Sequence, residues 1–150
     1  MTFRIHVAPL EEAEQVFAAM RLAFEEYRGK LYPESGALRE TLEEVRSGIA
    51  SGGAFLAFAD ATIAGSARYR VFPNHVYGER IGVLPAHRGR GIAVALTKAI
   101  ESSARERGIV QVHVKVRASI PSNLHVYEKL GYRVLASNPY PIGTDVEIGR

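Results

Sequence analysis

Residues 81–93 read IGVLPAHRGRGIA, a strand-like start followed by two glycines at the entrance to a long helical pattern. Glycine allows backbone conformations and close approaches that a Cβ would prevent. A helix N-terminus adds unpaired N–H groups and about half a positive elementary charge. Gly89 and Gly91 are therefore predicted to form an anion cradle suited to phosphate, to which Arg88 and Arg90 can add charge.

The chain has 150 residues, of which 47% are hydrophobic and 23% are charged. This size and composition predict one domain over residues 1–150. No cysteine is present, which excludes disulfides, thiolate metal ligands and a cysteine nucleophile. No apolar run approaches the roughly 20 residues that cross a bilayer, and the N-terminus lacks the apolar core of a signal peptide. A cytoplasmic location with no membrane partner is expected.

The net charge of +3 suits an anionic ligand. The basic residues are nevertheless scattered and mixed with acids, as in residues 101–107, instead of forming a stripe with interleaved aromatic residues. A specific nucleic-acid partner is therefore disfavoured. The histidines show no spacing typical of a metal site, so no metal is expected.

Hydrophobic periodicity predicts the order of strands and helices. The predicted strands cover residues 3–7, 54–59, 63–71, 76–84, 110–116, 132–137 and 145–148, and the predicted helices cover residues 10–27, 38–49, 92–103 and 124–130. Gly78 and Gly82 lie inside the fourth strand and suggest a bulge or a close backbone approach. The valines of the fifth strand are predicted to be core.

This order predicts an α/β fold with a mixed central sheet and helices on both faces. The first half of the sheet is expected to be antiparallel. The helix at 92–103 connects the fourth and fifth strands, and a right-handed crossover makes these two strands parallel. Ligands of open α/β sheets bind beyond the C-terminal ends of parallel strands, so a cleft is expected there.

At this point the chain resembles the GNAT superfamily of acyl-CoA-dependent N-acyltransferases over essentially its whole length. VLPAHRGRGIA at residues 83–93 is similar to the family's pyrophosphate loop, often written Q/R-x-x-G-x-G/A. The comparison rests on Gly89 and Gly91. A second match is NLHVYEKLGYR at residues 123–133. Two motifs on their expected elements make the resemblance specific.

The resemblance implies a single GNAT-like domain, a splayed cleft between the fourth and fifth strands, and acetyl-CoA as cosubstrate. It also implies that Asn123 lies near CoA, that Tyr127 sits beside its sulfur, and that Glu79 resembles the family's frequent strand-borne glutamate base. The expected cofactor-binding residues are Ile81, Val83, Arg88, Gly89, Arg90, Gly91, Ile92, Ala93 and Asn123.

Without a cysteine, direct attack of an amine on the thioester in a ternary complex is favoured. A bulged strand can turn a backbone N–H toward the thioester oxygen, and Val83 is the candidate, with Ile81 and Val83 pairing with the pantetheine arm. Tyr127 is the candidate acid for the leaving thiolate, since a phenol stays protonated at neutral pH; its alternative role is core packing. Glu79, His75 or water is the base.

Glu79 would share a strand face with Ile81 and Val83 if the fourth strand were regular. Its alternative role is a surface carboxylate paired with Arg80 or Arg68.

The sequence thus predicts an N-acetyltransferase that acetylates a primary amine of a small molecule. A peptide or protein N-terminus is the alternative acceptor, and a non-catalytic CoA-binding regulatory domain or a basic RNA-associated module is the alternative function. The acceptor pocket is expected between the loops at 27–33 and 138–143, near Arg28, Tyr32 and Tyr140. A homodimer is compatible with the resemblance. The residues themselves do not specify the acceptor.

Overall fold

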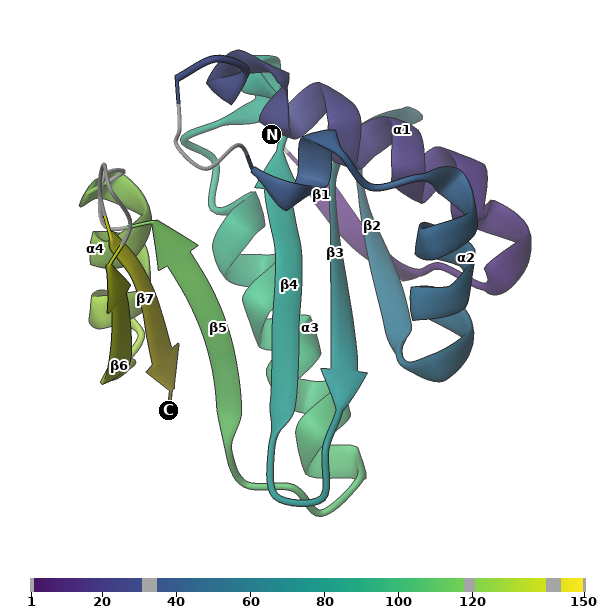
Figure 1. Ribbon diagram of the computed structural model, residues 1–150. Coiled ribbons are helices and arrows are strands. Elements are labelled where there is room, and N and C mark those ends of the chain that lie inside the picture. Colours follow the sequence, from purple (N-terminus) through teal and green to yellow (C-terminus); the bar gives the residue numbers. More distant parts are fainter. Residues whose placement is uncertain (1, 31–34, 118–120, 140–143, 150) are drawn as a thin grey trace.

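The structure is a computed structural model that describes the backbone of residues 2–30, 35–117, 121–139 and 144–149, and the side chains of residues 2–30, 35–115 and 125–135. In this part of the chain seven strands form one sheet in the order β1-β2-β3-β4-β5-β7-β6 (Figure 1). Neighbouring strands are antiparallel except β4 and β5, which are parallel. The predicted α/β fold with a mixed sheet is confirmed.

The elements follow the predicted order. The strands are β1 (Phe3–Val7), β2 (Gly53–Ala59), β3 (Thr62–Val71), β4 (Val76–Val83), β5 (Val112–Arg117), β6 (Arg133–Pro139) and β7 (Thr144–Gly149). The helices are α1 (Ala13–Phe24), α2 (Leu42–Ser51), α3 (Ile92–Glu106) and α4 (Pro121–Lys129), with short 3-10 turns η1 (Leu10–Glu12), η2 (Glu25–Tyr27), η3 (Gly36–Leu38) and η4 (Pro85–His87).

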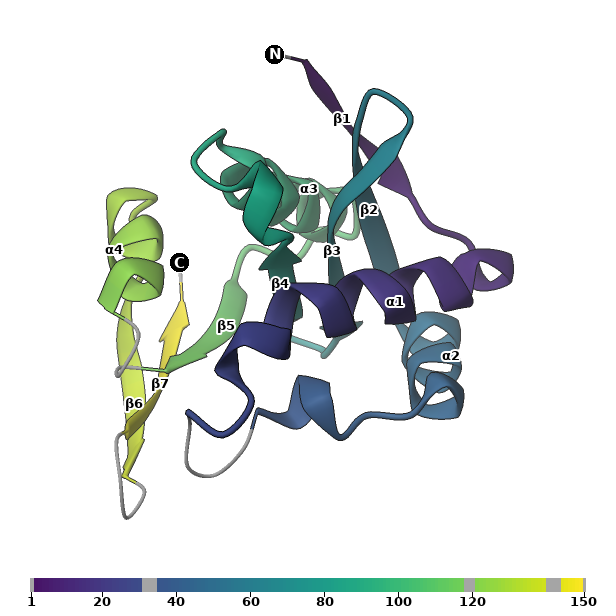
Figure 2. The same cartoon turned by 90° about the horizontal axis from the view of Figure 1, so that it is seen from above.

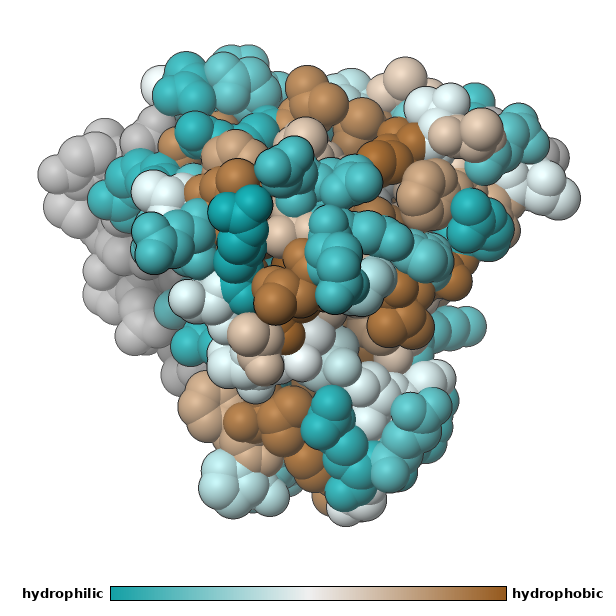
Figure 3. All heavy atoms as spheres, turned by 90° about the vertical axis from the view of Figure 1, so that its right-hand side faces the viewer, coloured by the Kyte–Doolittle hydropathy of each residue, from teal (hydrophilic) through white to brown (hydrophobic). Residues whose placement is uncertain are grey.

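Helices cover both faces of the sheet, as predicted. Figure 2 shows α1 and α2 on one side and α3 and α4 on the other. Two apolar clusters fill the interfaces, since one contains Leu96 and Ile100 of α3 and the other contains Met20 of α1 and Val45 of α2. On the face seen in Figure 3, apolar and hydrophilic residues are interspersed. No helix in the described ranges combines the length and apolar character needed to cross a membrane.

Helix α2 begins at Leu42, four residues later than predicted, because Thr41 caps it. The Thr41 hydroxyl accepts from the Glu44 N–H at 3.2 Å, and a Glu44 carboxylate oxygen accepts from the Thr41 N–H at 3.0 Å. This reciprocal capping box satisfies two N–H groups at the helix start. Leu38 belongs instead to η3, where it is buried.

Strand β5 begins at Val112, not at Val110. Val110 is 90% exposed, so the prediction that it belongs to the core is wrong. The left-handed φ of +73° at Gly108 ends α3, and the chain is first joined to β4 when the Gln111 carbonyl accepts from the Val76 N–H at 3.0 Å. Val112 and Val114 are buried core residues, as predicted.

Candidate functional site

Strands β4 and β5 pair over only a short part of their length. Residues 76–78 pair with residues 112–114, after which the two strands, both described throughout, have no further pairing (Figure 1). Glu79 is the first β4 residue beyond the last pair. Residues 79–83 of β4 and 115–117 of β5 do not pair with each other, and we call the region between them the β4–β5 splay. It lies at the C-terminal ends of the parallel strands, where the cleft was predicted.

A β-bulge interrupts β4 at the start of the splay. Ser66 pairs with Gly82 and Arg68 pairs with Glu79, so two steps along β3 face three steps along β4. The extra residue is Arg80, whose φ of +53° is in the left-handed region. The bulge that the strand glycines suggested is therefore present.

The backbone of β4 beyond the bulge presents N–H groups to the splay. The Leu84 N–H donates to the Ala64 carbonyl on the β3 side at 2.8 Å. Successive N–H groups of a strand point in opposite directions, so those of Val83 and Ile81 point away from β3. The Val83 carbonyl also points away from β3, since it accepts from the Nε of Arg88 at 3.0 Å.

The side chains of Ile81 and Val83 pack against the cluster on the α3 side of the sheet. Gly82, between them, faces α1, because an added Cβ would lie 2.8 Å from the Cβ of Ala23. Glu79 lies opposite Arg68, whose Nη1 packs beneath α2. Glu79 therefore does not share the face of Ile81 and Val83, since the bulge changes the alternation expected of a regular strand.

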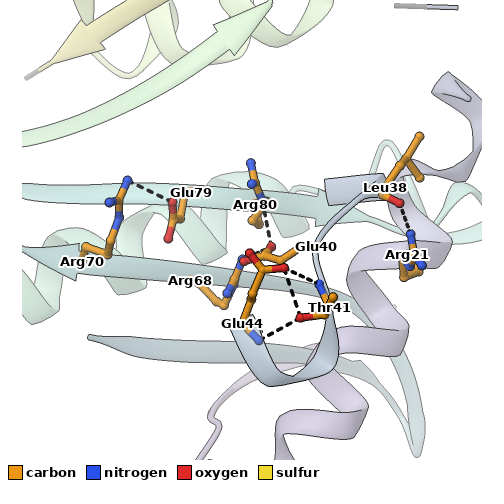
Figure 4. Close-up of polar contacts among 9 residues, drawn as sticks. All are labelled: Arg21, Leu38, Glu40, Thr41, Glu44, Arg68, Arg70, Glu79 and Arg80. Carbon is orange, nitrogen blue, oxygen red and sulfur yellow. Dashed lines mark hydrogen bonds and ion pairs between the residues drawn. The ribbon is translucent and has the colours of Figure 1, made fainter. Parts of the chain in front are cut away.

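Glu79 forms an ion pair with an arginine that the sequence analysis did not select. Its Oε2 lies 3.3 Å from the Nη2 of Arg70 on β3, and its side chain is 17% exposed (Figure 4). Arg68 and Arg80 both bind Glu40 instead. The predicted partners of Glu79 were thus wrong, although the carboxylate is ion-paired and stands at the start of the splay.

His75 lies at the opposite, paired end of β4. Its ring stacks between Phe72, at a centroid distance of 4.7 Å, and His113, at 4.1 Å. Because a strand rises about 3.3 Å per residue, four residues separate His75 from Glu79 by roughly 13 Å. The geometry therefore favours Glu79 over His75 as the group nearer the splay.

The loop after β4 has the form of an anion cradle. Gly89 and Gly91 have φ angles of +78° and +82°, which residues with a Cβ rarely adopt, and Gly91 is the N-cap of α3. An added Cβ at either glycine would meet no heavy atom within 4 Å. Within the described residues, no side chain caps α3 and its first turn contains no acid. The N–H groups of Ile92 and Ala93 are suited to a phosphate, whereas the Ile92 side chain is buried.

The side chain of Arg88 connects this loop to three other elements. Besides the Val83 carbonyl at the end of β4, the guanidinium binds the Ala23 carbonyl at 3.1 Å and the Glu26 carboxylate. Arg88 therefore joins the cradle to β4, to the end of α1 and, through Glu26, to η2. Arg90 is exposed on the same loop.

Tyr127 lies in the core between α4 and α3. It is 7% exposed, its hydroxyl is hydrogen-bonded to Thr97, and its ring packs against Tyr132 with centroids 5.4 Å apart. Burial raises the pKa of the Tyr127 phenol to about 12, although the Thr97 hydrogen bond acts in the opposite direction. The Thr97 hydroxyl donates to the Ala93 carbonyl at 2.9 Å. Thr97 therefore connects Tyr127 to the first turn of α3.

The remaining predicted site residues are only partly described. Asn123 lies within α4, and its side chain is outside the described residues, as are Tyr32 and Tyr140. Arg28 forms hydrogen bonds of 2.7 and 3.0 Å with Glu25. No cluster of three His, Asp or Glu side chains suited to a metal ion occurs in the part of the chain that the structure describes.

Sequence reasoning missed Glu40, which joins two arginines. Its Oε1 accepts from the Nε of Arg80 at 3.1 Å and from the Nη2 of Arg68 (Figure 4). Burial by itself would raise the pKa of the Glu40 carboxyl, but the hydrogen bonds and charges of the two arginines outweigh this effect and lower it. The predicted helix at 38–49 included Glu40, and no local signal indicated partners 28 and 40 residues away.

The family profile described as "Acetyltransferase (GNAT) family" matches residues 15–132. The PaiA N-acetyltransferase from Thermoplasma acidophilum, solved with coenzyme A, has a TM-score of 0.81 at 20% identity, with 98% of each chain covered. The Escherichia coli ribosomal-protein-S18-alanine N-acetyltransferase has a TM-score of 0.79 at 17% identity, with 99% of this chain and 92% of that one covered. This chain therefore belongs to the GNAT acetyltransferase family, and its fold is the family's fold.

Curated relatives match over a shorter stretch. An acetyltransferase from Pectobacterium atrosepticum is 40% identical over 55 residues, which are 37% of this chain and 39% of the relative. An acetyltransferase from Sodalis glossinidius is 39% identical over 54 residues. The matched stretches thus span about two fifths of these relatives.

Proposed function

We propose that this protein transfers an acetyl group from acetyl-CoA to a primary amine of a small molecule within a ternary complex. One juxtaposition supports the proposal most. The N–H groups of Ile81 and Val83 line the splay on one side of the bulge, and the uncapped N-terminus of α3 follows a few residues later. Such a strand can pair with the extended pantetheine arm of CoA while the cradle binds the CoA pyrophosphate.

Two groups of β4 would act on the reacting atoms. The Val83 N–H would donate to the thioester oxygen as negative charge develops there. Glu79, directly or through water, would remove a proton from the acceptor amine, whose nitrogen forms a bond to the carbonyl carbon. The ion pair with Arg70 supports this role because it holds the carboxylate at the start of the splay.

Tyr127 would complete the reaction. As the C–S bond breaks, its hydroxyl would give a proton to the leaving thiolate, so the products are an N-acetylated amine and CoA. A phenol with a pKa raised to about 12 remains protonated at neutral pH and is able to donate. Because the hydroxyl is buried beside Thr97, this role requires the sulfur to come within hydrogen-bonding distance of it.

Thermal unfolding with acetyl-CoA, CoA and ATP tests the donor site. Ligand at 100 times its Kd stabilises a protein by about 2.7 kcal/mol, so acetyl-CoA should raise the melting temperature and ATP should not. If millimolar acetyl-CoA leaves the melting temperature unchanged, the proposed function is contradicted. Free-thiol release over a panel of amines tests catalysis, and stabilisation without thiol release would identify a CoA-binding regulatory domain instead.

A further inference from the structure

Arg80 carries a positive charge that its ion pair does not balance. One carboxylate, Glu40, accepts from both Arg80 and Arg68, while Glu79 is engaged by Arg70. Among these five residues three guanidinium groups face two carboxylates, which leaves one positive charge. Arg70 is 49% exposed but is matched by Glu79 alone. Of the two arginines that share Glu40, Arg68 is 3% exposed and Arg80 is 31% exposed, so Arg80 is the one of that pair that a solute can reach.

The bulge places this arginine next to the proposed base. Arg80 directly follows Glu79, and the α-carbons of consecutive residues are about 3.8 Å apart. In a regular strand the two side chains would lie on opposite faces, but a bulge re-aims a side chain, and the Nε of Arg80 reaches Glu40 on the side of α2 (Figure 4). A non-glycine residue at φ +53° is also uncommon, and such outliers gather at functional sites.

The guanidinium keeps donors for a ligand. Its Nε is bound to Glu40, and its Nη2 lies where a Cβ on Gly36 would come within 2.7 Å, so the absence of a side chain at Gly36 leaves room for it. Within the described residues, no hydrogen bond engages Nη1 or Nη2 of Arg80. Two such donors match the two oxygens of a carboxylate.

We propose that the acceptor is a small primary amine that also carries a carboxylate, with the amine at Glu79 and the carboxylate at Arg80. This inference rests on the proposed acetyltransferase function. The same charge disfavours acceptors with a second ammonium group, because like charges repel at this range.

Thiol release with matched amines tests the proposal, using β-alanine, β-alaninamide and 1,3-diaminopropane as probes. Rates are compared per unit of neutral amine, which removes the difference in amine pKa. The wild type should favour β-alanine, and Arg80→Gly should lower kcat/KM for β-alanine about 10- to 100-fold while leaving the amide nearly unchanged. Glycine adopts φ +53° without strain, so this variant should fold, as its melting temperature would verify.

Arg39→Gln is the matched control, because Arg39 is an exposed arginine beside Glu40 that takes no part in these ion pairs. It should retain the wild-type preference. Equal use of the three amines by the wild type, or an unchanged preference in a folded Arg80→Gly variant, would overturn the carboxylate inference while leaving the acetyltransferase proposal intact. Absence of thiol release with every amine, together with no thermal response to acetyl-CoA, would overturn both.

Discussion

The Nε of Arg88 donates to the Val83 carbonyl at 3.0 Å, which fixes the cradle loop to the end of β4. Its two Nη groups reach the Ala23 carbonyl near the end of α1 and the Glu26 carboxylate of η2. The backbone of the proposed donor site is thereby linked to the segment that leads into the predicted acceptor loop. The hydrogen bonds of the Arg88 side chain are made to protein groups on other elements, so we predict that it positions the loop.

Arg88→Ala should therefore affect both stability and donor binding. Because the guanidinium is partly exposed, its loss should lower the free energy of unfolding by about 1 kcal/mol and raise KM for acetyl-CoA severalfold. Urea unfolding and acetyl-CoA titration at two salt concentrations measure these effects. Arg90→Ala is the control and should weaken binding in a salt-dependent way with little change in stability. If Arg88→Ala behaved like Arg90→Ala, Arg88 would be a direct phosphate ligand.

Tyr127→Phe should lower kcat by about 10²-fold while acetyl-CoA affinity stays nearly constant, because only the proton donor is removed. Steady-state kinetics with thiol detection and an acetyl-CoA titration separate the two quantities. Thr97→Val is a useful companion, since it removes the hydrogen-bond partner but keeps the phenol. An unchanged kcat in Tyr127→Phe would exclude Tyr127 as the acid.

The raised pKa of Tyr127 also predicts alkaline behaviour. In the unfolded chain the phenol loses its proton near pH 10, whereas in the folded protein it does so near pH 12. Between these values the folded state binds more protons than the unfolded chain. The contribution of Tyr127 to the free energy of unfolding is therefore fully present below pH 10 and is lost as pH rises to 12. The wild type should lose roughly 2 to 3 kcal/mol more than Tyr127→Phe over this interval in urea unfolding. Parallel curves for the two proteins would contradict this expectation.

Glu79→Gln should reduce the rate at neutral pH, and high pH should partly restore it because more of the acceptor is then a neutral amine. A pH–rate profile for kcat/KM measures this recovery. Arg70→Gln is the matched control, since it removes the partner of Glu79 but keeps the carboxylate, and it should retain most of the activity. A rate loss in Glu79→Gln that does not vary with pH would indicate a structural role.

Glu40→Ala should cost about 3 to 5 kcal/mol of unfolding free energy, because it leaves the buried Arg68 charge without its carboxylate. Urea unfolding measures the loss. Glu44→Ala provides a nearby comparison, since it removes only the exposed carboxylate half of the capping box and should cost about 1 kcal/mol. Similar losses in the two variants would show that the Arg68–Glu40 pair adds little.

The sequence determined the features that depend on neighbouring residues. Gly89 and Gly91 adopt the left-handed conformation that glycine takes without steric cost, as their place before a helix indicated, and their binding of phosphate stays a prediction. The buried valines of β5 followed from period-two alternation, whereas Val110 did not, because where a strand begins depends on its pairing partner. The start of α2 was predicted at residue 38, four residues too early, because the apolar periodicity did not include the Thr41–Glu44 capping box that begins the helix at Leu42.

The tertiary structure alone decided which distant side chains meet. The register between β3 and β4 placed the bulge at Arg80, separated Glu79 from the face of Ile81, and brought Arg70 to Glu79. Arg88 likewise meets Glu26, 62 residues earlier, because α1 packs beside β4. Local propensity acts over a few residues, whereas these contacts depend on how strands pair and helices pack, which no short stretch of sequence encodes.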